Sequence, residues 1–86
     1  MSRLRTPSGE KNIIGKKLIQ LRRIHHLSQR DLSHKLQLIG CDIDKNVITR
    51  IETNKRYVTD LELKAIAEVF NVSYKFLLDG DEEEND

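Results

Sequence analysis

Four short segments of the sequence share one pattern that marks the start of a helix. Each has a capping residue, Ser28, Asp44, Thr59 or Ser73, with one apolar residue directly before it and another four positions after it. The capping side chain accepts a hydrogen bond from a first-turn amide, and the two apolar residues pack together. Thr59 also has Glu62 at the position of a reciprocal capping box. Four such starts constrain the chain to a set of short helices.

Apolar residues in these segments recur at the three- and four-residue spacing of one helix face. A first helix is expected from about Glu10 to His26, and four more follow the caps. No segment alternates as a strand does. We therefore expect an all-α fold, a compact five-helix domain over residues 10–78. The expected core positions are Ile14, Leu18, Leu21, Leu32, Leu36, Ile48, Ile51, Leu63, Ile66, Ala67 and Phe70.

Charge is distributed unevenly along the 86 residues, although the net charge is only +1. Residues 1–58 carry 13 Lys and Arg against 5 Asp and Glu, whereas residues 59–86 carry 2 against 9. The basic part is the one that a polyanion would meet. We interpret residues 1–9 as a mobile basic N-terminal arm and residues 79–86 as a disordered acidic tail.

Composition also bears on location. No stretch is apolar and long enough to span a membrane, and none has the features of a signal peptide. The single cysteine, Cys41, cannot form an internal disulfide, which fits a reducing compartment. The sequence therefore predicts a cytoplasmic protein.

Residues 44–53 are expected to form a helix whose outer side is polar and basic. Lys45, Asn46 and Arg50 lie on that side. Lys and Arg side chains pair with guanine in the major groove, and Asn pairs with adenine through two hydrogen bonds. The segment therefore predicts a recognition helix that enters the major groove of double-stranded DNA.

Several separated elements share their types and order with one known family: Leu21-Arg22-Arg23, Leu27-Ser28-Gln29, Leu32, Ile48-Thr49-Arg50-Ile51-Glu52, Asn71-Val72-Ser73 and Leu77-Leu78. With these elements the chain resembles, over about residues 13–78, the lambda repressor/Cro-type helix-turn-helix family (XRE-like). The resemblance implies a lambda-repressor-like fold in a bacterial or phage transcriptional regulator, more a repressor than an activator. It also implies binding to a pseudo-palindromic operator as a homodimer.

The resemblance assigns roles to individual residues. Lys45, Asn46 and Arg50 match the positions that face base edges, with Thr49 at the border of the groove. Arg22 and Glu52 match a partly buried ion pair that joins the first helix to the recognition helix. The positions implied to contact the DNA backbone are Gln29, Lys16 or Lys17, Lys55 and Arg56.

The chain departs from the family pattern between the second and third helices. Residues 38–43 make this turn about five residues longer than the usual three- to four-residue turn. We expect the insertion to be ordered, with Ile43 packed on Ile48 at the start of the third helix. Leu38 and Ile39 are expected to fold back onto the core. Gly40 is expected to reverse the chain as a left-handed helix cap.

No set of residues suggests catalysis, a metal or a cofactor. The sequence has no glycine-rich phosphate loop and no nucleophile elbow. His25, His26, His34 and Cys41 match no zinc spacing. We therefore expect neither an enzyme nor a metalloprotein.

Two alternative functions remain open. The first is an antitoxin that represses its own operon and binds a toxin, which an exposed apolar surface would favour. The second is a helical protein-interaction module without DNA binding, which the basic outer face of residues 44–53 disfavours. Some of the apolar residues near the loop between the third and fourth helices and in the fifth helix are also candidates for self-association. They are Tyr57, Val58, Tyr74, Phe76 and Leu78.

Overall fold

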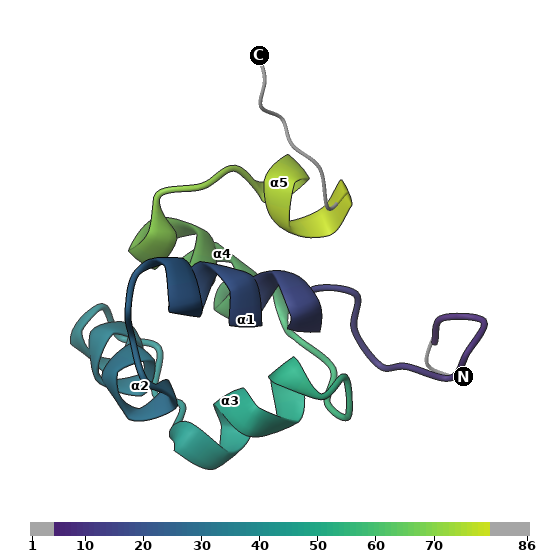
Figure 1. The fold of residues 1–86 in the computed structure, drawn as a ribbon, viewed down its shortest axis with the longest axis horizontal. Coiled ribbons are helices and arrows are strands. Elements are labelled where there is room, and N and C mark those ends of the chain that lie inside the picture. Colours follow the sequence, from purple (N-terminus) through teal and green to yellow (C-terminus); the bar gives the residue numbers. More distant parts are fainter. Residues whose placement is uncertain (1–4, 80–86) are drawn as a thin grey trace.

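The computed structural model describes residues 5–79, which contain five α-helices (Figure 1). This part contains no strand, which confirms the all-α fold class. The expected disordered tail falls largely on residues 80–86, outside the described residues, as do residues 1–4 of the expected arm. The helices are α1 (Gly15–Ile24), α2 (Gln29–Leu38), α3 (Lys45–Glu52), α4 (Asp60–Phe70) and α5 (Tyr74–Asp79).

The helices surround one apolar core, with α1 in the middle of the view in Figure 1. α3 lies along one edge of the molecule and α5 along the opposite edge. α3 packs against α1 and α2, and α4 packs against α2 and α5. Nearly all the expected core residues are buried; Leu63 is only half-buried against the cluster. The largest fully buried side chains are Ile14, Leu18, Leu32, Leu36, Ile48, Ile51, Ile66 and Leu77.

All four expected helix caps are present. The Ser28 hydroxyl accepts from an amide in the first turn of α2, in a reciprocal capping box, and Thr59 does the same for α4. Asp44 accepts a hydrogen bond from the amide of Val47 at 2.9 Å. Ser73 accepts one at 3.0 Å in α5. Local side-chain chemistry therefore determines where these helices begin.

Four helices end in a common way, with one residue in the left-handed region of backbone conformation. These residues are His26, Gly40, Asn54 and Asn71, with φ between 54° and 90°. The amide that follows each one donates to a carbonyl five positions earlier, which is the Schellman arrangement. The left-handed cap expected at Gly40 is thus confirmed, and His26 shows that a side chain other than Asn can occupy this position.

The first helix is shorter than the sequence predicts. The expected start at Glu10 and end at His26 are wrong, because α1 runs only from Gly15 to Ile24. The backbone before α1 contacts another part of the chain: the amide of Lys11 donates to the carbonyl of Asn54 at 3.1 Å. A tertiary contact therefore replaces the first helical turns that local spacing suggests.

The long turn between α2 and α3 differs from its expected packing in one respect. Ile43 is buried in the core with Ile48, as expected. The expectation that Leu38 and Ile39 fold back is wrong, since their exposures are 85% and 42%. Helix α2 continues through Leu38, which lies about 200° around the helix from the buried Leu36.

Gly15 provides a test of how closely α1 approaches α3. A Cβ atom at Gly15 would lie 2.7 Å from the carbonyl oxygen of Ile51 and 2.9 Å from that of Glu52. Helix propensity alone makes Gly15→Ala stabilising by about 1 kcal/mol. The contacts reverse this sign, because overpacking costs about 1–3 kcal/mol. Urea unfolding is expected to show a less stable variant.

Gln20→Ala, an exposed change on the same helix, is the control and is expected to stay within about 0.5 kcal/mol of the wild type. A Gly15→Ala variant more stable than the wild type would show that the two helices can separate at no cost.

Candidate nucleic-acid interface

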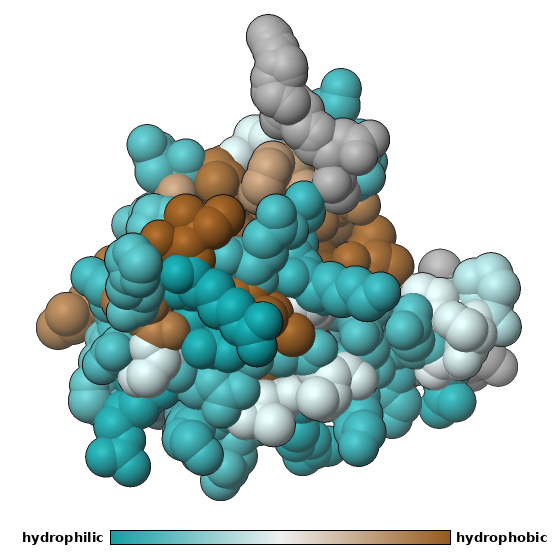
Figure 2. All heavy atoms as spheres, viewed as in Figure 1, coloured by the Kyte–Doolittle hydropathy of each residue, from teal (hydrophilic) through white to brown (hydrophobic). Residues whose placement is uncertain are grey.

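Helix α3 has one buried and one exposed side. Ile48, Ile51 and Glu52 are buried, whereas the side chains expected to face base edges are on the surface. Lys45, Asn46 and Arg50 are exposed, and Thr49 is half-buried. In Figure 2 the edge formed by α2 and α3 is mainly hydrophilic, and most hydrophobic residues lie nearer to α5. The edge with α3 is therefore the polar face of the molecule.

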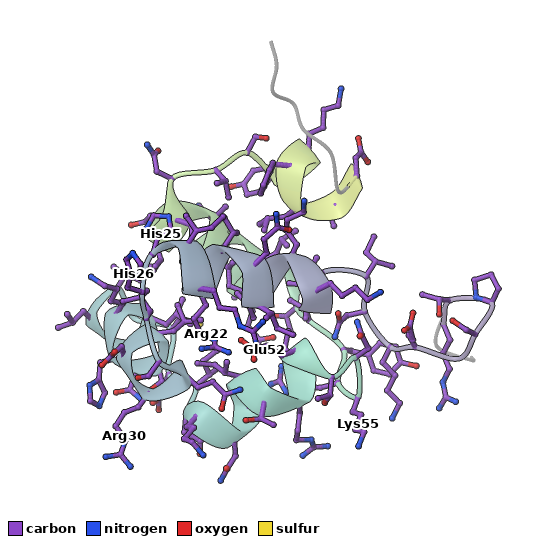
Figure 3. All side chains as sticks on the ribbon, in the orientation of Figure 1. Arg22, His25, His26, Arg30, Glu52 and Lys55 are labelled. Carbon is purple, nitrogen blue, oxygen red and sulfur yellow. The ribbon has the colours of Figure 1, made fainter. Side chains whose placement is uncertain are left out.

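A buried ion pair connects α3 to α1. Arg22 Nε donates to Glu52 Oε2 at 2.7 Å and Arg22 Nη2 donates to Glu52 Oε1 at 3.2 Å. Figure 3 shows the two side chains pointing toward each other between the helices. Glu52 is only 6% exposed, so Arg22 replaces most of the water that its side chain would otherwise contact. Arg22 Nη1 also donates to the carbonyl of Leu27, which fixes the plane of the guanidinium.

Gln29 extends this pair to the surface of α3. Its Nε2 donates to Glu52 Oε1 at 2.8 Å, and the hydroxyl of Thr49 donates to its Oε1 at 2.9 Å. One polar chain therefore joins α1, α2 and the outer part of α3. A primary amide has two N–H groups, so the contact with Glu52 leaves one for the phosphate contact expected of Gln29.

Two asparagines fasten the other end of α3. Asn12 Nδ2 donates to the carbonyl oxygens of Ile51 at 3.1 Å and Arg56 at 2.9 Å. Asn12 Oδ1 accepts from the amide of Gly15, and Asn54 Nδ2 donates to the same oxygen. We name Asn12 and Asn54 the asparagine clasp. It joins the start of α1 to the end of α3. Asn is a common residue at a helix start, but no neighbouring residue indicates the contacts of Asn12 with the end of α3.

Two residues expected to contact the DNA backbone, Lys55 and Arg56, follow α3 and differ in their exposure and bonding. Lys55 is exposed, and Figure 3 shows it projecting beyond the end of α3. Arg56 is half-buried and forms two hydrogen bonds with Glu62, at 2.8 and 3.0 Å. The hydrogen bond that Arg56 donates to Glu62 raises the pKa of Arg56. Lys55 is therefore available to a phosphate, whereas Arg56 is already engaged by a carboxylate.

The two lysines at the start of α1, Lys16 and Lys17, also differ in exposure and direction. Lys16 is exposed, whereas the ammonium of Lys17 lies 4.3 Å from the centre of the Phe76 ring on α5. Lys17 is thus directed toward the side opposite α3. Arg30 on α2, which was not among the expected residues, is exposed and projects at the other end of α3 from Lys55 in Figure 3. Its position directly after Gln29, which is expected to contact a phosphate, could have indicated Arg30 from the sequence.

Within residues 5–79 no group of three His, Cys, Asp or Glu side chains could hold a metal ion. His25 packs its ring edgewise on Phe70, with centroids 5.1 Å apart. Burial, and secondly the charge of Glu62, raises the pKa of the Cys41 thiol. In the same described part, no helix has the length and apolar character needed to cross a membrane.

The fold and this polar face define a helix-turn-helix protein, with α2 and α3 as the two helices of the motif. The sequence matches the helix-turn-helix family over residues 18–77, and the chain belongs to this family. The resemblance to the lambda repressor/Cro type is thereby confirmed. The protein is a DNA-binding regulator rather than an enzyme.

Among solved structures, the chain is similar to the P22 c2 repressor protein, which was crystallised in complex with the synthetic operator 9T. The two chains share 18% identity with a TM-score of 0.69, and the match covers 81% of this chain and 98% of that chain. No curated protein matches the chain. The structural similarity confirms the lambda-repressor-like fold.

The pair of Arg56 and Glu62 predicts a specific pH dependence of stability. Burial alone would raise the pKa of Glu62, but hydrogen bonds from Arg56 and from the amide of Thr59 hold it below its usual value of 4.5. A lowered pKa means that the pair stabilises the fold above pH 4.5 and loses this contribution as the pH falls through the folded-state pKa.

We expect Glu62→Gln to destabilise the protein most at pH 7, with the difference from wild type shrinking progressively below pH 4.5. Urea unfolding across this range measures it, with Glu68→Gln on the exposed side of α4 as the control. A difference that is independent of pH would show that Glu62 gains nothing from its charge.

Proposed function

We propose that the protein is a sequence-specific, double-stranded DNA-binding transcriptional regulator, and specifically a repressor, that inserts α3 into the major groove. The observation that carries the proposal is that α3 has one side buried in the protein and one side exposed to solvent. Glu52 is anchored in the interior while Lys45, Asn46 and Arg50 remain exposed on one surface. A recognition helix needs both properties, because its outer side chains must reach base edges from a fixed position.

The proposed division of labour follows the chemistry of the side chains. Arg50 and Lys45 donate to guanine, Asn46 pairs with adenine, and Thr49 lies at the edge of the groove. The proposed phosphate contacts lie around them and supply most of the affinity without sequence preference. They are Gln29, Lys16, Lys17, Lys55 and Arg56, to which the structure adds Arg30. Of these, Lys55 is supported best and Lys17 least, because Lys17 packs on α5.

We further propose that the protein acts as a homodimer on an operator with two inverted half-sites. A groove of about 380 Å³ between α4 and α5 offers an apolar surface, with Leu61 75% exposed and Tyr74 50% exposed. Asp60 and Lys64 also line this groove. A two-fold axis can place the acid of one protomer against the base of the other, so the surface is self-complementary.

In such a dimer the two recognition helices enter major grooves about 34–36 Å apart. The similarity in fold to the P22 c2 repressor protein, whose structure contains operator DNA, supports this arrangement. Repression then follows from occupancy of the promoter and requires no further activity of the chain. The proposed setting is the cytoplasm of a bacterium, with a bacterial or phage origin of the gene.

Selection of bound duplexes from a random pool, followed by sequencing, tests this function. Enrichment of inverted repeats is expected. On the enriched site, Arg50→Ala and Asn46→Ala are each expected to cost about 1–3 kcal/mol of binding free energy, with a much smaller loss on scrambled DNA. Lys75→Ala, an exposed change on α5, is the matched control. Equal losses on both duplexes would exclude base contacts by α3.

One observation favours a second function, the autorepressing antitoxin. Leu38 and Ile39 form an exposed apolar corner in the turn between α2 and α3, and such a surface suits a protein partner. The test is neutralisation of a toxin encoded by the adjacent gene. Loss of neutralisation in a Leu38→Ser variant that still binds DNA would support this function, and the absence of a toxic neighbour would exclude it.

A further inference from the structure

Residues 5–11, which we name the N-terminal segment, form a folded loop before α1. The amide of Thr6 donates to the carbonyl of Glu10 at 2.9 Å, and the amide of Gly9 donates to the carbonyl of Thr6 at 2.8 Å. Figure 1 shows the segment extending past the end of α3, away from α2. The segment is therefore folded and lies beyond the end of α3.

Two contacts attach the N-terminal segment to the chain that follows α3. The amide of Lys11 donates to the carbonyl of Asn54, and the asparagine clasp fixes the next residue. Tyr57 supplies the second attachment. Arg5 Nε donates to the Tyr57 hydroxyl at 3.3 Å, and Lys11 Nζ lies 5.6 Å from the centre of the Tyr57 ring. One aromatic side chain thus holds two cations of the segment.

These cations lie next to the positive charge at the end of α3. Arg5 and Lys55 are exposed, Lys11 is half-exposed, and Lys55 directly follows the clasp residue Asn54. The ion pairs of the described residues, Arg22–Glu52 and Arg56–Glu62, involve none of them. Exposed cations without a carboxylate partner gain most from a polyanion. All three cations therefore belong to, or are bonded to, the chain segment that directly follows α3, residues 54–57.

We propose that the N-terminal segment is a second DNA-contacting element, in which Arg5 and Lys11 bind backbone phosphates next to those bound by Lys55. Tyr57 acts as a positioning residue that holds both cations in line with α3. The proposal rests on the proposed DNA-binding function and extends the interface beyond the helix-turn-helix motif. Because phosphates carry no sequence information, the segment adds affinity on every duplex.

The salt dependence of DNA binding by the full chain tests this element. Each phosphate contact contributes about 0.9 to the slope of log affinity against log salt concentration. Arg5→Ala and Lys11→Ala are each expected to lower that slope by about this amount, on preferred and scrambled duplexes alike. Lys75→Ala removes the same charge from α5, at the opposite edge, and is expected to leave the slope unchanged.

A mutant cycle tests the positioning role. Tyr57→Phe keeps the ring and removes the hydroxyl that accepts from Arg5. It is expected to weaken DNA binding in the wild-type background and to have no effect in the Arg5→Ala background. A merely structural role of Tyr57 would give the same loss in both backgrounds, and that result would overturn its assignment as a positioning residue.

The DNA contact of the N-terminal segment and the proposed DNA-binding function can be contradicted by different results. If Lys55→Ala lowers the slope while Arg5→Ala and Lys11→Ala leave it unchanged, the N-terminal segment does not touch DNA, although the proposed function stands. If the wild-type chain binds no duplex at low salt, the proposed function fails and the second element with it.

Discussion

The buried carboxylate of Glu52 is the group on which the arrangement of the helices depends. It accepts from Arg22 on α1 and from Gln29 on α2, and it belongs to α3 itself. Such a pair adds little net stability, because desolvation offsets the attraction, but removing one partner costs about 3–5 kcal/mol. The pair instead fixes the position of α3, because the helix can rotate or slide only if the buried carboxylate of Glu52 loses its partners. Through Gln29 the same chain of hydrogen bonds reaches Thr49 on the outer side.

The asparagine clasp complements this pair at the other end of α3. Glu52 controls how α3 faces the interior, while Asn12 and Asn54 attach its last turn to the start of α1. The close approach at Gly15 brings the backbones of α1 and α3 together at the same place. Both ends of the helix are thus held by groups away from its outer face. The exposed side chains are therefore free to differ in sequence without changing the position of α3.

The sequence predicted features that depend on neighbouring residues and missed those that depend on distant ones. The helix caps and the reversal at Gly40 follow from local chemistry, and the structure contains them. The pair of Arg22 and Glu52, 30 positions apart, was within reach only through the family resemblance. Asn12 was missed because its carbonyl partners lie 39 and 44 positions away. The exposure of Leu38 was missed because it depends on where α2 ends.

The claim that the buried ion pair sets the position of α3 is tested most directly by comparing DNA-binding specificity in the wild type and in Glu52→Gln. The substitution keeps the shape of the side chain but removes its negative charge and one of its two acceptor oxygens, so the ion pair with Arg22 is lost. At a temperature where circular dichroism shows a folded variant, the ratio of affinities for preferred and scrambled duplexes is expected to fall about tenfold, or about 1.4 kcal/mol. Glu68→Gln on α4 serves as the control and should keep the wild-type ratio. An unchanged ratio in folded Glu52→Gln would contradict the claim that the buried pair sets the position of the recognition helix.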